Sequence, residues 1–287
     1  MIKNKVMIAL LLAMLAGITL IPSVSASENN EINAEVNMDD ALTTEEKIIS
    51  SIPSNQNSVE NITKAKELLE KVKAQNIQEI SDSVNKSTSG TQIKSATTVT
   101  LGTDKTLTTA DIGNSGTSTS GAVPNFKDAD YSTSYRRARA SVLIGPGGYG
   151  TGGAWAWVGK SIYVSGSGSR SANIRMAGNI KGETSAFAGG QSNTDINLIV
   201  KDTTTGTSYT TSIYSQSAGG VGDYIVDESF NDGISVTLQA GHYYNIYVSV
   251  DGSTAVYYAG EAGSDFGPGD GDDGGQKVSY SSIVIDF

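Results

Sequence analysis

The stretch that decides the fold is residues 234–258, which read ISVTLQAGHYYNIYVSVDGSTAVYY. Apolar and polar residues alternate on both sides of residues 240–242, whose sequence AGH is typical of a turn. The pair Asp251-Gly252 predicts a second turn, followed by a third strand. Period-two alternation interrupted by glycine turns is the pattern of half-buried antiparallel strands. The stretch therefore predicts an antiparallel meander.

The C-terminal two thirds of the chain repeat this pattern. Every Tyr, Trp and Phe lies at or beyond Phe126, and alternating runs recur, among them residues 137–144, 196–200 and 278–287. No helical periodicity separates these runs, and about ten short strands with glycine-rich turns are best accommodated by two packed sheets. We therefore predict an all-β domain over residues 96–287, an antiparallel two-sheet sandwich of the jelly-roll-like type.

The N-terminus has the pattern of a secretory signal peptide over residues 1–26. Lys3 and Lys5 precede an uncharged apolar run, and small residues end at Ala26 where a signal peptidase would cut. The alternative is an uncleaved membrane anchor, but the run is shorter than the roughly 20 residues that span a bilayer. The sequence thus predicts a secreted protein with no stable membrane span once the signal is removed.

Residues 27–95 form a separate polar segment without any aromatic residue. Within it, apolar residues recur at helical intervals after a capping sequence at residues 57–60, which predicts a helix over residues 58–84. This helical or flexible segment is interpreted as a spacer, as a propeptide or as an oligomerising helix, and the sequence leaves all three open.

Charge and composition exclude several classes of function. The chain of 287 residues carries a formal charge of −10 and contains no Cys. This acidic balance argues against nucleic-acid binding, which depends on clustered Lys and Arg, and against electrostatic docking on anionic lipid. Without Cys the chain can form neither a disulfide framework nor a thiolate metal site.

Catalysis is not the favoured interpretation, and no catalytic residue is assigned. The one histidine, His242, lies in a turn and is expected to be exposed. No G-x-S-x-G motif marks a nucleophile on a strand-to-helix turn. A glycoside hydrolase that uses two carboxylates remains open, because sequence spacing does not fix the separation of two acids.

Aromatic side chains on strands are the candidate ligand-binding residues. Trp155 and Trp157 are two positions apart, so both leave the same face of a strand. On an exposed face they would form a platform for sugar rings, whereas on an inner face they would fill the core between the sheets. The full set of candidates is Trp155, Trp157, Tyr243, Tyr247, Tyr257 and Tyr258.

An acidic, glycine-rich loop near the C-terminus is the candidate metal site. Residues 261–273 read EAGSDFGPGDGDD and contain no basic residue. Closely spaced carboxylates suit a hard cation such as Ca²⁺, although the spacing is not that of an EF-hand, and a solvated acidic loop is the alternative. The candidate ligands are Glu261, Asp265, Asp270, Asp272 and Asp273. No other cofactor is predicted.

Three functional hypotheses follow. The first is a secreted, noncatalytic module that binds carbohydrate or another cell-surface component, with calcium as a candidate aid to binding. The second is a structural subunit of the surface-layer or adhesin type, which would associate with copies of itself. The third is a secreted carboxylate-dependent glycoside hydrolase or lyase. Fold class alone does not choose among them, because β-sandwiches host many functions.

Overall fold

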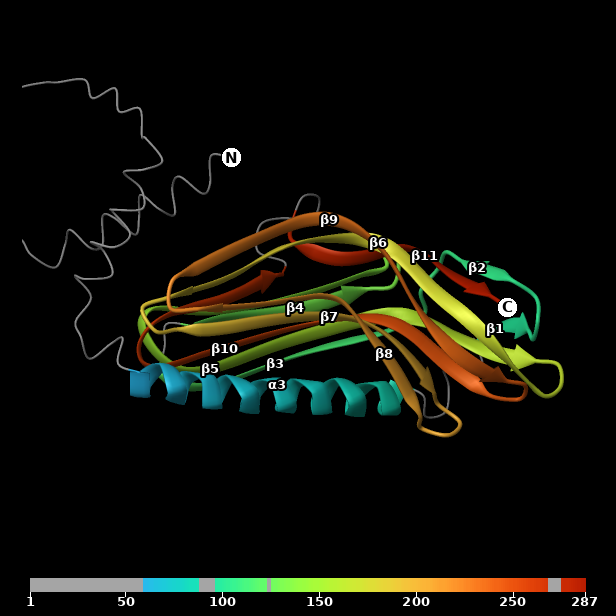
Figure 1. Ribbon diagram of the computed structural model, residues 1–287, viewed down its shortest axis with the longest axis horizontal. Helices are drawn as coiled ribbons and strands as arrows, with labels where there is room; N and C mark the ends of the chain where they lie inside the picture. Colours follow the sequence, from blue (N-terminus) through green and yellow to red (C-terminus); the bar gives the residue numbers. More distant parts are fainter. Residues whose placement is uncertain (1–58, 88–95, 123–124, 268–274) are drawn as a thin grey trace, which may run out of the picture. The chain divides into compact units, whose positions relative to one another are not determined.

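The computed structural model describes residues 59–87, 96–122, 125–267 and 275–287. In these residues one helix, α3 (Val59–Ser87), precedes eleven strands (Figure 1). The strands are β1 Thr97–Thr100, β2 Lys105–Leu107, β3 Ile112–Ala122, β4 Asn125–Ser132, β5 Arg137–Ser165, β6 Ser169–Phe187, β7 Gln191–Asp202, β8 Ser208–Gly219, β9 Gly222–Gln239, β10 Tyr243–Phe266 and β11 Lys277–Asp286. The predicted signal peptide lies outside the described residues.

The strands form two packed sheets that share β5 and β10. In the first sheet, β3, β5, β10, β7 and β8 lie side by side in that order. In the second sheet, β9 pairs with β6, and β6 pairs with the end of β10. The end of β10 pairs with the start of β5, which in turn pairs with β4. β11 pairs with β6 and with the start of β5, and β2 pairs with β11. The predicted all-β sandwich with a helical segment before it is confirmed.

Two long strands cross from one sheet to the other where glycines and bulges allow the chain to bend. β5 pairs with β4 as far as Ile144 and with β3 from Tyr149 onward. Gly150 between the sheets has a left-handed φ of 132°, and a Cβ there would lie 2.1 Å from a backbone oxygen. The register of β10 against β5 shifts on both sides of Gly260. Bends and bulges of this kind form the corners of sandwiches.

One hydrophobic core fills the space between the sheets. It contains Val158, Leu198 and Val248 from the first sheet and Ile174 and Ile285 from the second, all fully buried. Because side chains alternate along a strand, the neighbouring residues of the first sheet point away from this core. That opposite face is the one on which α3 lies.

The predicted meander is wrong in its pairing. β9 pairs with β6 in the second sheet, whereas β10 pairs with β5 and β7, so the turn at residues 240–242 connects two sheets. The second predicted turn is also wrong, because Asp251 and Gly252 lie within β10. Gly252 is not among the glycines with positive φ, and a Cβ there would lie 2.5 Å from Ser264 Oγ. The glycine is needed for close packing and not for a turn.

Two further expectations need correction. The strands are not uniformly short, since β5 has 29 residues and β10 has 24. The sheets are also not wholly antiparallel, because β1 pairs with β5 in the parallel direction. Long strands are required here because the same segments serve both sheets in turn.

The helix α3 begins where the sequence predicts and continues to Ser87, three residues beyond its expected end. It packs on β10, β5, β3 and β7 (Figure 1). Its buried residues follow helical spacing: Ala65, Leu69, Val72, Asn76, Ile80, Ser83 and Val84. Within the described part of the chain, no helix is long and apolar enough to cross a membrane. The roles of spacer, propeptide or oligomerising element remain predictions.

Candidate functional site

A groove lies beside α3 on the outer face of the first sheet. Its volume is about 680 Å³, and its walls come from α3, β7, β8 and β10. Hydroxyl, amide and carboxyl groups alternate there with apolar side chains. The residues that line the groove include Ile77, Asp195, Asn197, Ser215, Tyr247 and Asp251. A concave surface of this size is typical of small-ligand sites.

Strand register explains why these side chains meet. Asp195 on β7 lies opposite Asp251 on β10 and opposite Ser215 on β8. The next row on the same face contains Asn197 beside Ser249. Side chains two positions apart leave the same face of a strand, so successive rows build a continuous polar surface. The serine and threonine side chains of β8 on this face are exposed and form the open side of the groove.

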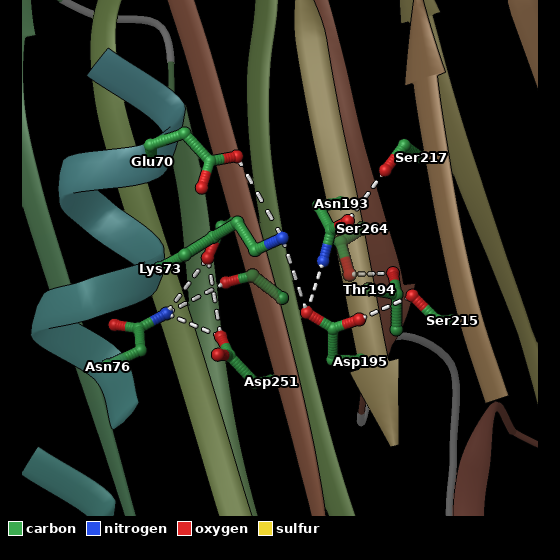
Figure 2. A network of polar contacts seen from close by, with 12 residues as sticks. Glu70, Lys73, Asn76, Asn193, Thr194, Asp195, Ser215, Ser217, Asp251 and Ser264 are labelled. Atoms are coloured by element: carbon green, nitrogen blue, oxygen red, sulfur yellow. Dashed lines mark hydrogen bonds and ion pairs between the residues drawn. The ribbon is translucent and has the colours of Figure 1, made fainter. Parts of the chain in front are cut away.

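Asp195 is held in place by three neighbours (Figure 2). It accepts hydrogen bonds from Asn193 Nδ2 at 2.7 Å and from Ser215 Oγ at 2.6 Å. Lys73 of α3 forms an ion pair with it, with 3.5 Å between Nζ and Oδ2. Its side chain is still 23% exposed, so it can accept further hydrogen bonds from a ligand in the groove.

Asp251, which lies opposite Asp195 on the neighbouring strand, is buried. Only 3% of the residue is exposed, and its Oδ1 accepts hydrogen bonds from Asn76 Nδ2 at 2.7 Å and from Ser253 Oγ at 3.3 Å. Burial raises the pKa of Asp251 to about 7, and the nearby Asp195 adds to this, while the bond from Asn76 opposes it. The two carboxyl groups of the groove therefore have different environments.

The two tryptophans lie beneath α3, on the face opposite the core. Trp155 and Trp157 are 5% and 0% exposed, respectively. Trp155 Nε1 donates to Glu79 Oε2 at 2.8 Å, and Trp157 Nε1 donates to Ser83 Oγ at 2.7 Å. They thus share a face as predicted, but they form neither an exposed platform nor the packing between the two sheets.

The candidate tyrosines are distributed over several places. Tyr247 is buried under α3, with its ring centroid 5.2 Å from that of Trp157, and burial raises its pKa above the ordinary value. Tyr243 is half-buried and packs against Tyr163 at 4.9 Å. Tyr257 and Tyr258 are exposed where β10 bends between the sheets, and they do not line the groove.

The acidic candidates are only partly described. Glu261 is half-buried and burial raises its pKa, while Asp265 lies opposite Glu183 in the second sheet. Asp270, Asp272 and Asp273 lie outside the described residues. In the part of the chain that the structure describes, no three acidic or histidine side chains are placed to hold a metal ion. Calcium binding by this loop stays a prediction.

The histidine is not exposed in the way the sequence suggested. His242 Nδ1 lies 2.8 Å from Asp202 Oδ2, and the histidine side chain is 15% exposed. Asp202 also accepts hydrogen bonds from the backbone of Thr204 and Thr205. Burial alone would raise the pKa of Asp202, but the hydrogen bond with His242 and the two backbone bonds together lower it below the ordinary value. The contact between His242 and Asp202 connects the turn before β10 with the turn after β7, which is a structural role.

The sequence did not point to the groove residues Asp195 and Asn197, nor to Lys73 and Asn76 of α3, which contact the two acids of the groove. One signal was present, because Asn76 interrupts the apolar stripe of the helix midway between Val72 and Ile80. A polar residue at a buried helical position needs a partner, and here the partner is Asp251. The pairing of β7 with β10, which brings in Asp195, had no local signal.

No protein-family model and no curated protein matches this chain. Similar solved structures include a family 61 carbohydrate-binding module in complex with β-1,4-galactotriose, with 10% identity over 60% of this chain and 88% of that chain and a TM-score of 0.22. The enzymatically active domain of bacteriophage CBA120 tailspike protein 4 shows 14% identity over 59% of this chain, with a TM-score of 0.19. The modules of Clostridium thermocellum xylanase 10B complexed with xylohexaose show 11% identity over 60% of this chain, with a TM-score of 0.17.

This chain spans 19% of the tailspike structure and 26% of the xylanase structure. TM-scores at this level establish neither a shared fold nor a shared function. The function of this chain therefore has to be argued from the groove itself.

Proposed function

We propose that this chain is a secreted, noncatalytic module that binds a carbohydrate of a cell surface or matrix in the groove beside α3. The observation that carries the proposal is the row of Asp195, Asn197 and serine hydroxyls along a concave wall that also contains apolar side chains. A sugar offers hydroxyl groups to carboxylate and amide acceptors and donors, and offers its C–H face to apolar surface.

The groove is suited to a polar ligand because its key acceptor is already ordered. Asp195 is fixed by Asn193, Ser215 and Lys73 before any ligand arrives. Preorganised groups lose little conformational freedom on binding, so more of the interaction energy contributes to affinity. Ile77, which is 60% exposed, provides apolar surface on the α3 side of the groove.

A glycan array, run with and without calcium, tests the binding. We expect selective binding, and we expect Asp195→Asn to weaken it about tenfold or more, because a hydrogen bond to a charged group contributes roughly 1.5–3 kcal/mol. Asp227→Asn is the matched control, since Asp227 is an exposed acid on β9 of the second sheet. Silence across the array, or equal loss in both variants, would contradict the proposal.

Export of the protein is part of the proposal and rests on the signal pattern of residues 1–26. N-terminal sequencing of the protein recovered from the culture medium should give a chain that starts after Ala26, or later if the polar segment is also removed. Recovery of the intact N-terminus in the cell fraction alone would exclude export.

A second candidate is a carboxylate-dependent glycoside hydrolase. One observation favours it: Asp195 and Asp251 lie directly opposite each other on neighbouring strands, and the raised pKa of Asp251 suits a proton donor. The burial of Asp251 beneath Asn76 speaks for the binding module instead. Release of reducing sugar that is abolished in Asp251→Asn would establish the hydrolase.

A further inference from the structure

The sheet surface under α3 has an unusual composition for a permanently buried face. We define the covered face as Trp155, Trp157, Tyr247, Ser249, Asp251 and Ser253, all of which are buried. Surfaces that are buried in every state of a protein are normally apolar, because each buried polar group needs a partner. This face instead combines aromatic rings with hydroxyl and carboxyl groups, which is the composition of a wet binding surface.

The helix provides hydrogen-bond partners for this face from three of its own polar side chains. Glu79 and Ser83 accept the two indole N–H bonds. Asn76 Nδ2 donates to Asp251 Oδ1, and also to Gly252 O and Ser253 Oγ at 3.2 Å each (Figure 2). The hydroxyl groups of a sugar can make the same bonds as acceptor and donor.

The fit of the helix is incomplete. Asn76 is fully buried, yet its Oδ1 has no hydrogen-bond partner among the described residues. An unsatisfied buried polar group lowers stability, so the docked state of α3 is less stable than one in which every polar group had a partner. A competitor that provides the missing bonds would favour displacement of the helix.

Glycines leave room for two of the aromatic residues to lie close to the sheet. A Cβ at Gly116 on β3 would lie 2.5 Å from the indole ring of Trp155. A Cβ at Gly159 would likewise lie 2.5 Å from Tyr247 Cβ. Without side chains at these positions the aromatic residues can lie close to the backbone of the neighbouring strand. A flat aromatic face is the surface that stacks on the apolar face of a pyranose.

We propose that α3 is a displaceable cover, and that its movement extends the groove from Tyr247 over Trp157 and Trp155 into a platform for a longer glycan chain. This inference rests on the proposed function of the groove. A short oligosaccharide binds in the groove beside the docked helix, and a longer one shifts the equilibrium toward the displaced state because only that state offers it the rings.

A reversible crosslink tests the cover in the full chain. Asn76 and Gly153 face each other, since a Cβ at Gly153 would lie 2.4 Å from Asn76 Oδ1. The chain has no Cys, so Asn76→Cys with Gly153→Cys should form one disulfide that locks α3 down when oxidised. The reduced form of the same protein lacks the Asn76 hydrogen bonds, so we expect it to favour the released state. The two single-cysteine variants are the controls.

Two readouts are available without knowing the natural ligand. Trp155 and Trp157 are the only tryptophans in the chain, so acrylamide quenching of intrinsic fluorescence reports directly on the cover. We expect strong protection in the oxidised form and clear quenching in the reduced form. Short and long members of β-linked xylose, galactose and N-acetylglucosamine oligosaccharide series provide the binding probe. Long members should bind the reduced form about tenfold more tightly than the oxidised form.

The outcomes separate the two proposals. If short oligosaccharides bind both forms and long ones gain nothing on reduction, the cover is overturned while the groove stands. If no oligosaccharide binds either form, the proposed function fails and the glycan platform fails with it. If the tryptophans are equally protected in both forms and in Asn76→Asp, which places a second carboxylate beside Asp251, then α3 is not displaceable and the inference is wrong.

Discussion

Asp251 on β10 lies directly opposite Asp195 on β7, while Asn76 of α3 donates a hydrogen bond to Asp251 from 175 positions earlier in the chain. One acid is thus buried by the helix, and the other remains open to the groove. Like charges on directly opposite residues destabilise a sheet unless one of them is neutral or compensated. Here Lys73 compensates Asp195, and the raised pKa of Asp251 favours its neutral form.

The first prediction concerns the pH dependence of stability. The pKa of Asp251 is raised from 3.8 to about 7 in the folded protein. The folded state therefore binds the proton more tightly, so this stabilisation is fully present below pH 4 and is lost as the pH rises through 7. At about 1.4 kcal/mol per pKa unit the loss is on the order of a few kcal/mol. Asp251→Asn should remove it, and should raise Tm at pH 8.

Thermal unfolding of the wild type and of Asp251→Asn from pH 4 to pH 8 checks this. The two Tm curves should diverge with rising pH, and Asp227→Asn should run parallel to the wild type because Asp227 is exposed. Parallel curves for Asp251→Asn as well would mean that the carboxyl group stays charged in the folded state.

Glu183 should add to the same trend from the second sheet. Burial and the neighbouring Asp223 raise its pKa to about 7, so its contribution is also lost as the pH rises toward neutrality. Glu183→Gln should flatten part of the remaining slope. Because Glu183 and Asp251 lie in different sheets without shared partners, the effects of the two substitutions on Tm should add. Strong non-additivity in the double variant would show that the sites are linked.

Local periodicity was sufficient to predict the core faces and the helix. Alternation placed Val248 and Leu198 on inner faces, and helical spacing placed Leu69 and Val72 on a buried stripe. These assignments succeed because side-chain direction depends on backbone geometry within a few residues. The same patterns gave Trp155 and Trp157 a common face but could not say what covers it.

Pairing across long sequence separations could not be predicted. Asp251-Gly252 predicts a hairpin turn because Asp-Gly is common in such turns. In the structure, however, the neighbours of this pair in space come from β5, β7 and another part of β10. Likewise, the sequence of α3 did not predict that the helix packs on the sandwich. Its docking depends on the complementarity of Asn76 and Glu79 to side chains that lie far along the chain.

The calcium prediction concerns the acidic stretch over residues 261–273, which the sequence suggested to be a loop but whose residues 261–266 belong to β10. If the loop binds Ca²⁺, millimolar calcium should raise Tm by mass action, since the ion would bind only the folded state. Asp270→Ala combined with Asp272→Ala should abolish the gain, and Asp195→Asn should leave it intact. Magnesium at the same concentration controls for ionic strength. An unchanged Tm with calcium would identify the loop as a solvated acidic segment.

The last prediction separates close packing from a turn as the reason for Gly252. A Cβ at this position would lie 2.5 Å from Ser264 Oγ and 2.9 Å from Ser264 Cβ. Gly252→Ala should therefore destabilise the protein by roughly 1–3 kcal/mol, the usual cost of overpacking in a dense interior. Ser264→Gly removes the obstructing atoms, so the double variant should recover more stability than the two single effects predict, measured by urea unfolding. If Gly252 were required for a left-handed turn conformation, Ser264→Gly would give no rescue, because backbone strain at residue 252 does not depend on the side chain facing it.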